Sequence, residues 1–216
     1  METEINTNGF PQLEVTRKTG DEPFHLNGTP MDSLLVNFWS WSMSDLVSNT
    51  TRGVLAEYIV AHALGLTDRL RIEWDAYDLR TPSGTRIEVK AAGYLQSWHH
   101  DKLSAITFNI RPARGWDAST NVLAPNPQRH ADIYVFCVLK HKDKATLDPL
   151  NLDQWEFYLL RAAVLNEQLG EQRTLSLGRL LKLDPLRVTY GGLAAGIDAL
   201  SKLTITATGN SAMITL

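Results

Sequence analysis

The feature that most constrains this chain is the run ADIYVFCVLK at residues 131–140. It is apolar over almost its whole length and contains Val, Ile, Tyr and Phe, which is typical of a strand buried on both faces. The run QWEFYLL at residues 154–160 alternates like a second strand. Strand-like composition also occurs at 70–80, 85–95 and 103–110.

Helical patterns lie before and after these strands. A helix is expected over 51–64, because SNTT offers N-cap residues and Gly65 fits the position after the last turn. A second helical pattern lies at 31–47, where Phe38, Trp39 and Trp41 are expected to be core residues; the alternative is a base-stacking platform. Three short helices are expected at 161–170, 175–183 and 193–203.

This order of elements predicts a mixed α/β fold. Residues 111–130 hold three prolines with Asn, Gly and Ser, and are expected to form a long loop. We expect an extended or poorly ordered arm followed by a single domain with a core and a helical extension. These parts are expected at 1–30 for the arm, 31–216 for the domain, about 50–160 for its core and 161–216 for the extension.

Composition excludes several classes of protein. Cys137 is the only cysteine among 216 residues, which excludes an intrachain disulfide and a multi-cysteine zinc cluster and favours a reducing, cytoplasmic location. The N-terminal residues are polar and acidic, unlike a signal peptide, and no apolar run approaches the roughly 20 residues of a membrane helix. The net charge is −3, but residues 69–144 carry twelve Lys and Arg against eight Asp and Glu, which is compatible with a local phosphate-binding face.

The strand expected at 85–92 has one apolar and one charged face. With a period of two, Ile87 and Val89 point one way while Glu88 and Lys90 point the other. A sheet edge that faces water would show the same pattern. The preceding residues are therefore needed to distinguish such an edge from a functional site.

A hairpin is expected before this strand. Thr81-Pro82-Ser83-Gly84 suits a type I turn followed by a glycine bulge. Counting outward from this turn pairs Arg80 with Arg86 and sets Asp78 opposite Glu88, where directly opposed Cβ atoms lie about 5 Å apart. Two opposed carboxylates repel unless a cation lies between them, and hard divalent cations bind such oxygen pairs. A register shifted by one residue would make Asp75 the candidate instead.

Glu57 is a third acidic candidate. It lies in an almost wholly apolar helical segment, so it is expected to be buried and to need a partner. That partner is either an arginine (Arg52, Arg69 or Arg71) or the same cation site.

These residues together resemble the PD-(D/E)XK nuclease superfamily, whose fold is that of restriction endonucleases. The resemblance covers about residues 50–140 and consists of Glu57 on a helix, then Asp78, nine intervening residues and Glu88-Val89-Lys90. It implies an α/β fold with a mixed sheet flanked by helices, together with the N-terminal arm and helix and the C-terminal helical additions. Two features depart from the family pattern: Tyr77 precedes Asp78 where proline is usual, and 111–130 looks like a loop where a helix is usual.

The resemblance also implies roles for these residues. Asp78 and Glu88, with the carbonyl of Val89, are expected to hold Mg²⁺, for which Mn²⁺ is an expected substitute. Lys90 is expected to orient the attacking water or stabilise charge on the phosphate, and Glu57 to bind a second metal or its water shell. The implied function is phosphodiester hydrolysis, with DNA as the expected substrate and no membrane partner; the oligomeric state stays open, because a homodimer is common among double-strand cutters.

Substrate-binding candidates follow the strand. Gln96 shares the face of Glu88 and Lys90 if the strand continues, and a polar strand end is the plainer interpretation. Aromatic rings stack on bases and cations meet phosphates, so a contact cluster is also expected from residues nearby. The candidates are Tyr94, Trp98 and Lys102, with Arg111, Arg114 and Arg129 in or beside the long loop.

Two other functions remain open from the sequence. One is a non-catalytic nucleic-acid-binding or interaction module that keeps the nuclease fold. The other is a different hydrolase that uses Asp75 or Asp78 with His62 or His100, although no nucleophile motif such as G-x-S-x-G occurs.

Overall fold

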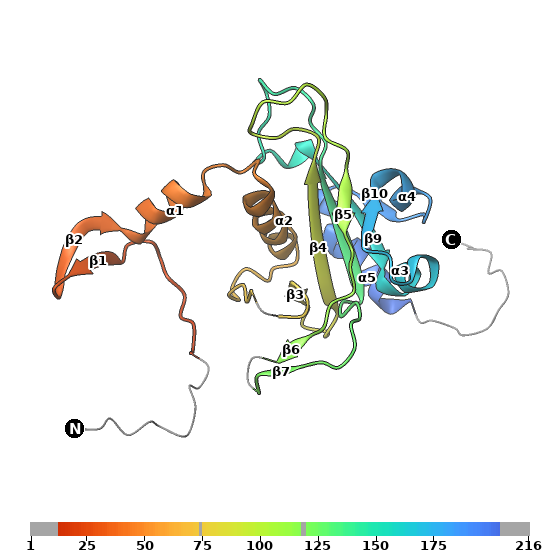
Figure 1. The fold of residues 1–216 in the computed structure, drawn as a ribbon, viewed down its shortest axis with the longest axis horizontal. Helices are drawn as coiled ribbons and strands as arrows, with labels where there is room; N and C mark the ends of the chain where they lie inside the picture. The colour runs from red at the N-terminus through yellow and green to blue at the C-terminus, as the bar shows by residue number, and fades with distance from the viewer. Residues whose placement is uncertain (1–12, 74, 118–119, 204–216) are drawn as a thin grey trace.

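The computed structural model describes residues 13–73, 75–117 and 120–203. Within them, the centre is a five-stranded sheet in the order β11-β9-β8-β4-β3 (Figure 1). Strands β4 and β8 are parallel and the other neighbours are antiparallel, so the predicted mixed α/β fold is confirmed. The strands are β3 (Leu79–Arg80), β4 (Arg86–Gly93), β8 (Ile133–Leu139), β9 (Trp155–Arg161) and β11 (Leu186–Val188).

Strand β8 lies at the centre, and all of its residues are buried, as its apolar run predicts. Val135 and Cys137 pack on one side of the sheet, while Tyr134 and Phe136 pack on the other. The first side is covered by helices α2 and α5, and the second by strands β5 and β10 with helices α3 and α4. These elements are α2 (Asn49–Ala63), β5 (Thr107–Asn109), α3 (Ala162–Leu169), β10 (Thr174–Ser176), α4 (Leu177–Leu181) and α5 (Leu193–Lys202).

Helix α2 forms where its caps place it. The Ser48 side chain accepts a hydrogen bond from the backbone N–H of Thr51, and Gly65 follows the last turn with φ +65°. Ala56, Ile59 and Val60 lie at helical spacing and are buried against the sheet. The expected helix is therefore confirmed to within two residues at its start.

The β3–β4 hairpin has the predicted register. Leu79 pairs with Ile87 and Arg80 with Arg86, and Gly84 closes the turn with φ +94°. The strand expected over 70–80 is much shorter in the structure: β3 contains two residues, at the edge of the sheet.

The connection from β4 to β8 contains no helix in its described residues, as the loop-like composition of 111–130 predicts. In place of a helix it carries strand β5 and a small hairpin of β6 (Trp116–Asp117) and β7 (Val122–Leu123). This hairpin lies at the lower end of β4 in Figure 1.

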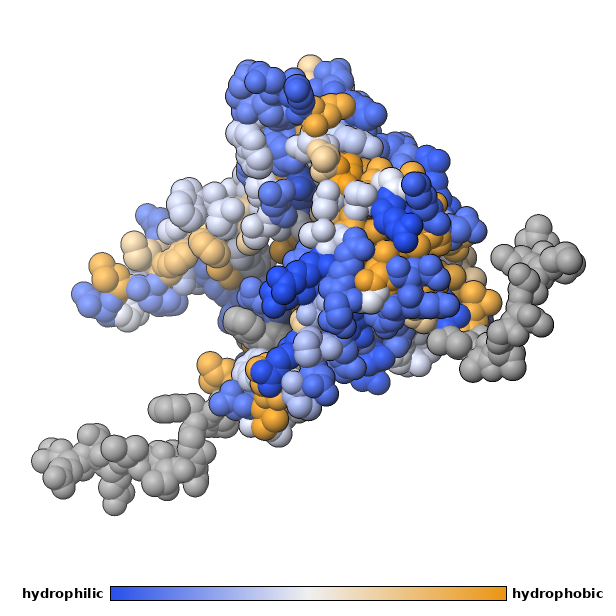
Figure 2. All heavy atoms as spheres, turned by 45° about the vertical axis from the view of Figure 1, so that its right-hand side comes forward, coloured by the Kyte–Doolittle hydropathy of each residue, from blue (hydrophilic) through white to orange (hydrophobic). Residues whose placement is uncertain are grey.

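The N-terminal part projects from the domain as a β1–β2 hairpin followed by α1 (Figure 1). The prediction that Phe38, Trp39 and Trp41 are core residues is wrong: their exposed fractions are 45%, 38% and 84%, and no residue of α1 is buried. The helical spacing is real, but the helix has no sheet to pack on, and Figure 2 shows hydrophobic residues on the surface of this arm. These elements are β1 (Pro23–Leu26), β2 (Thr29–Leu34) and α1 (Leu35–Met43).

Two further observations concern the expected C-terminal extension and the possibility of a membrane-spanning helix. Strand β11 and helix α5, both in the expected extension, complete the central sheet and its cover. Among the described residues, no helix has the length and apolar character needed to cross a membrane.

Candidate active site at the β3–β4 edge

Asp78 lies directly before β3, at the outer edge of β4. Its backbone N–H donates to the carbonyl of Ile87 at 3.0 Å, and its Oδ2 accepts from the N–H of Val89 at 2.7 Å. Continuing the observed register by one residue sets Asp78 beside Glu88, and both line one cavity. The predicted cross-strand arrangement is therefore present, and the alternative, Asp75, is exposed in the same cavity.

The carbonyl of Val89 points to the same edge. In a strand, the N–H and C=O of one residue point to the same neighbour. The N–H of Val89 points at Asp78, so its carbonyl oxygen also points out of β4 toward Asp78. The short β3 leaves this stretch of the β4 edge unpaired, and an acidic side chain fills part of the gap.

Glu88 and Lys90 share one face of β4 and bind each other. Lys90 Nζ lies 2.5 Å from Glu88 Oε1, and the side chains are 28% and 19% exposed. Because their face is only partly open to water, this pair is more than a solvated sheet edge. It holds a positive charge beside the Asp78–Glu88 pair.

Glu57 is held by an arginine. Its side chain is 14% exposed and accepts two hydrogen bonds from Arg71, at 2.5 Å from Nε and 3.2 Å from Nη2. Arg52 instead donates to Val47 and Asn49, as part of the turn that starts α2. Of the two alternatives that the sequence left open, the arginine partner is therefore present, and it is Arg71.

The acidic groups nevertheless act on one another. Burial raises the pKa of Asp78 to about 7, with further contributions from the charges of Glu88 and then Glu57. The expected crowding of like charges contributes to this rise, after burial. Glu57 therefore lies close enough to Asp78 to affect its ionisation, although Arg71 binds both of its oxygens.

The edge offers oxygen ligands of the kind that Mg²⁺ prefers. In the part of the chain that the structure describes, no three His, Cys, Asp or Glu side chains form a ready metal-binding group. Mg²⁺ does not need such a group, because it usually keeps several waters and binds one or two carboxylates together with substrate phosphates. Asp78 and Glu88, with the Val89 carbonyl, fit that requirement, and a cation would offset the charges of Glu88 and Glu57 that add to the effect of burial on the pKa of Asp78.

Two cavities meet at Asp78. One has a volume of about 700 Å³ and is lined by Glu57 and Asp75, by two tyrosines and by four arginines, among others. Those six are Tyr58, Tyr77, Arg17, Arg69, Arg71 and Arg80. The other has a volume of about 630 Å³ and is lined by Glu88 and by residues of the β5–β8 connection, including Arg114, Trp116 and His130. One side of the acidic edge is therefore rich in cations and the other has an aromatic wall.

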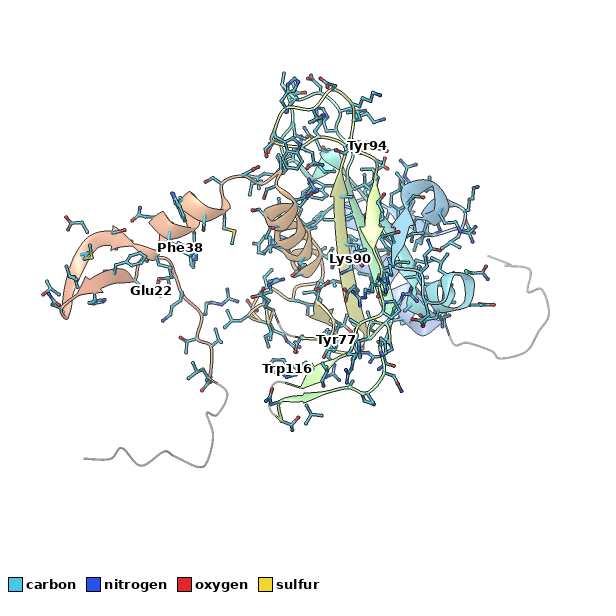
Figure 3. All side chains as sticks on the ribbon, viewed as in Figure 1. Glu22, Phe38, Tyr77, Lys90, Tyr94 and Trp116 are labelled. Atoms are coloured by element: carbon cyan, nitrogen blue, oxygen red, sulfur yellow. The ribbon has the colours of Figure 1, made fainter. Side chains whose placement is uncertain are left out.

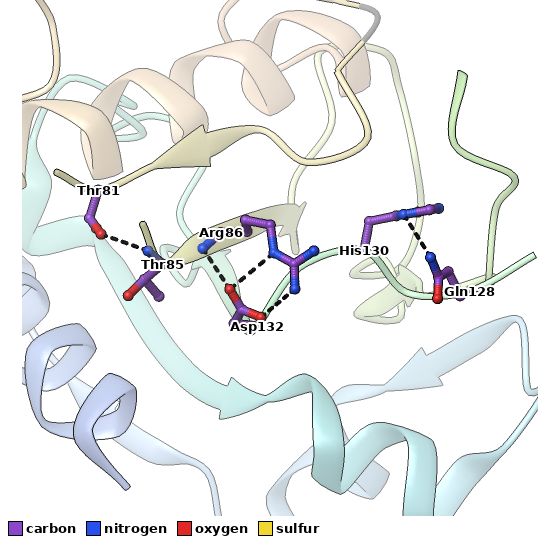
Figure 4. Close-up of polar contacts among 6 residues, drawn as sticks. All are labelled: Thr81, Thr85, Arg86, Gln128, His130 and Asp132. Carbon is purple, nitrogen blue, oxygen red and sulfur yellow. Dashed lines mark hydrogen bonds and ion pairs between the residues drawn. The ribbon is translucent and has the colours of Figure 1, made fainter. Parts of the chain in front are cut away.

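Hydrogen bonds tie the hairpin to the centre of the sheet (Figure 4). The Arg86 guanidinium donates to Asp132, directly before β8, at 2.6 Å and 3.1 Å, and the Arg86 N–H donates to it at 2.9 Å. Thr81 Oγ1 accepts from the N–H of Thr85 across the turn at 3.0 Å. These contacts fix the register on which the Asp78–Glu88 alignment depends.

Most of the expected substrate residues lie away from this edge. Tyr94, Gln96, Trp98 and Lys102 follow the carboxyl end of β4, whereas Glu88 lies near its amino end, and Figure 3 shows Tyr94 at the opposite end of β4 from Tyr77 and Trp116. Gln96 is buried, and its amide donates to Gly93 O and Ser104 Oγ. These hydrogen bonds give Gln96 a structural role in its loop. The expectation that Gln96 shares the face of Glu88 and Lys90 required the strand to continue, but β4 ends at Gly93.

The remaining candidates divide by exposure. Trp98 and Lys102 are exposed, and the Tyr94 ring carries Lys142 Nζ at 4.6 Å from its centroid. Arg111 is exposed after β5, and Arg129 is buried under hydrogen bonds to Ile110, Asn166, Gly170 and Gln172. Sequence reasoning missed Trp116, His130, Arg17 and Arg80, whose segments show no periodic pattern that would place them at the site.

Comparison with known proteins gives one family. The family model described as bacteriophage T4 endonuclease IV matches residues 34–177, two-thirds of the chain. The match includes Glu57, Asp78, Glu88 and Lys90. No curated protein matches the chain.

Proposed function

The chain belongs to the bacteriophage T4 endonuclease IV family, and from this premise we propose that it is a divalent-metal-dependent endonuclease that hydrolyses phosphodiester bonds of DNA at the β3–β4 edge. Membership in this family makes the chain a nuclease that acts on nucleic acid. The observation that supports the finer proposal is the half-buried Asp78 beside Glu88, with its pKa raised to about 7. A structural ion pair would lower that pKa, whereas a cation site with crowded carboxylates raises it.

Each residue then has a chemical task. Asp78, Glu88 and the Val89 carbonyl hold the cation, which when bound polarises the scissile phosphate and makes the attacking water more acidic. Lys90 is paired with Glu88 at 2.5 Å, so its ammonium would lie beside a cation held by Glu88 and beside the phosphate that the cation binds. An ammonium at that point stabilises charge that develops on the phosphate oxygens. This is the metal chemistry of the PD-(D/E)XK site that the sequence resembles.

Glu57 and the arginines serve the substrate side of this proposal. Both oxygens of Glu57 bind Arg71, so we assign Glu57 an indirect role through the water shell of the cation and through holding Arg71. Arg71, Arg17, Arg69 and Arg80 line the cavity next to Asp78. Phosphates of a bound strand would meet these guanidinium groups, which bind phosphate well because their planar fork donates two hydrogen bonds.

A cleavage assay tests the proposal. Mixed DNA and RNA substrates are incubated with Mg²⁺, with Mn²⁺ and with EDTA. We expect DNA to be cut with either metal and nothing to be cut in EDTA, with Glu88→Gln inactive under all conditions. Cleavage that persists in EDTA would contradict the metal mechanism, and a protein that binds but never cuts would favour the binding-module function.

The raised pKa of Asp78 predicts how metal binding depends on pH. A carboxyl must lose its proton to bind a cation, so below a pKa of about 7 the apparent Mg²⁺ or Mn²⁺ affinity should fall about tenfold for each pH unit, as one proton is released per ion bound. Calorimetric titration from pH 5.5 to 8.5 measures this slope. The same affinity across that range would contradict a ligand role for Asp78.

A further inference from the structure

The β6–β7 hairpin exposes an apolar face beside a charged site. Trp116 and Leu123 are cross-strand partners, and Trp116, Val122 and Leu123 have exposed fractions of 37%, 59% and 45%. Contiguous exposed apolar side chains are typical of binding surfaces. Figure 3 shows Trp116 at the end of β4 where Tyr77 also lies.

The base of this hairpin is held firmly. Ala113 and Gln128 exchange backbone hydrogen bonds of 3.0 Å and 2.9 Å, and Arg114 Nε donates to Ala124 O at 2.6 Å. The His130 ring lies against this base: Nε2 is 2.9 Å from Ala113 O and Nδ1 is 3.3 Å from Gln128 Nε2 (Figure 4). A loop fixed in this way presents its side chains in one arrangement before a ligand arrives.

A glycine allows this close packing. A Cβ on Gly115 would lie 2.8 Å from Cε1 of His130, closer than real Cβ contacts come. The residue before Trp116 therefore needs to be glycine for the hairpin to sit on the His130 ring. The close approach of the Gly115 backbone to the His130 ring helps to fix where Trp116 lies.

Trp116 shares a cavity with the acidic edge. Trp116 and Arg114 line the cavity of about 630 Å³ that Asp78 and Glu88 also line. The indole N–H donates to Asn121 Oδ1 at 3.1 Å, which fixes the ring relative to the turn. Glu73 and Asp75 add two more acids to this cavity, so its lining holds four acids and one arginine and suits a base ring better than a second phosphate.

We propose that Trp116 stacks on the nucleobase next to the scissile phosphate, so that the β6–β7 hairpin positions the substrate over the Asp78–Glu88 edge. This inference rests on the proposed nuclease function. The indole offers a π-face, and every base has one, so the contact adds affinity without selecting a particular base. The arginine-lined cavity on the other side of Asp78 receives the backbone, and the two surfaces together hold one strand across the site.

Binding measurements on three variants test the stacking contact. Labelled oligonucleotide is titrated in the Lys90→Ala background, so that nothing is cut, and fluorescence anisotropy gives the Kd. Trp116→Ala should weaken binding about tenfold, Trp116→Phe should restore most of the loss, and Trp98→Ala should stay within twofold of the parent. Trp98 is the matched control, because it is also exposed but lies beyond the other end of β4.

Two additional readouts separate stacking from other causes. Removing an aromatic ring leaves the dependence of log Kd on log salt unchanged, whereas removing a phosphate contact lowers its slope. Trp116→Leu keeps an apolar side chain without a π-face and should bind as weakly as Trp116→Ala. The leucine variant also tests the stacking contact if the alanine variant does not fold. Equal binding by Trp116→Ala and its parent, or full binding by Trp116→Leu, would overturn the proposal.

The two proposals fail in different ways. A wild-type protein that cuts DNA with metal, in a series where Trp116→Ala binds normally, contradicts only the stacking contact. A wild-type protein that cuts nothing, in a series where Trp116→Ala binds weakly, contradicts the nuclease mechanism and supports the stacking contact.

Discussion

Replacing Asp78 with asparagine should make the metal-free protein more stable at pH 8 and at the same time abolish cleavage. The folded-state pKa of Asp78 is about 7, above the ordinary value of 3.8, because the carboxyl is buried near Glu88 and Glu57. The folded protein therefore binds this proton more tightly than the unfolded chain does, so metal-free stability falls as the pH rises from about 4 to about 7. An amide cannot ionise, and its Oδ1 can still accept the hydrogen bond from Val89.

We expect Asp78→Asn to gain about 2–3 kcal/mol more unfolding free energy at pH 8 than at pH 5 in EDTA, since one titrating proton changes stability by at most about 1.4 kcal/mol per pH unit and pH 5 lies about two units below the folded-state pKa. Cleavage should fall by a factor of about 10³ or more, because the cation supplies several kcal/mol of transition-state stabilisation. Urea unfolding at both pH values and cleavage rates with Mg²⁺ measure the two effects.

The matched control is Asp75→Asn. It removes the same charge from an exposed side chain in the same cavity. It should leave stability within about 0.5 kcal/mol of wild type, the usual range for surface substitutions. A gain in stability for Asp78→Asn that is the same at pH 5 and pH 8, or an equal gain for Asp75→Asn, would show that Asp78 is not the carboxyl with the raised pKa.

Lys90→Ala should remove cleavage and leave metal binding intact. Lysine is not a ligand for Mg²⁺, but its Nζ lies 2.5 Å from Glu88 and so beside the proposed cation. Loss of one positively charged or hydrogen-bonding group at the reacting centre costs about 10²–10³ in rate. Metal affinity should stay the same or rise, because Glu88 no longer shares its charge with an ammonium.

Single-turnover cleavage and calorimetric titration with Mn²⁺ measure these two properties on the same sample. Lys140→Ala is the control, because Lys140 also pairs with a glutamate, Glu156, at 3.8 Å, on a partly exposed part of the sheet. Its cleavage rate should stay within about twofold of wild type, since surface ion pairs contribute little. Wild-type cleavage by Lys90→Ala, or loss of its metal binding, would contradict the role given to Lys90.

The parts of the site that could be predicted are those set by local sequence. The Thr81–Gly84 turn determines its own geometry, and the register follows by counting, so the position of Asp78 beside Glu88 could be deduced before any long-range contact was known. The same holds for α2, whose Ser48 cap and Gly65 are local signals.

The parts that could not be predicted depend on tertiary partners. Glu57 had several arginines in reach by sequence, and only the folded path of residues 64–71 selects Arg71. The periodicity of α1 predicts a helix but not whether a surface exists to cover Trp41. Trp116 lies in a connection without a repeating pattern, and its position depends on tertiary contacts such as that of Gly115 with His130.

The central claim is that Asp78, Glu88 and the Val89 carbonyl bind a divalent cation. Anomalous scattering from Mn²⁺ in crystals of the wild-type protein tests it most directly. We predict a single strong anomalous peak at coordination distance from one oxygen of each of these three residues, absent in Glu88→Gln crystals. A wild-type protein that cuts DNA with Mn²⁺ while its peak lies elsewhere, with Asp78 and Glu88 uncoordinated, would contradict the account.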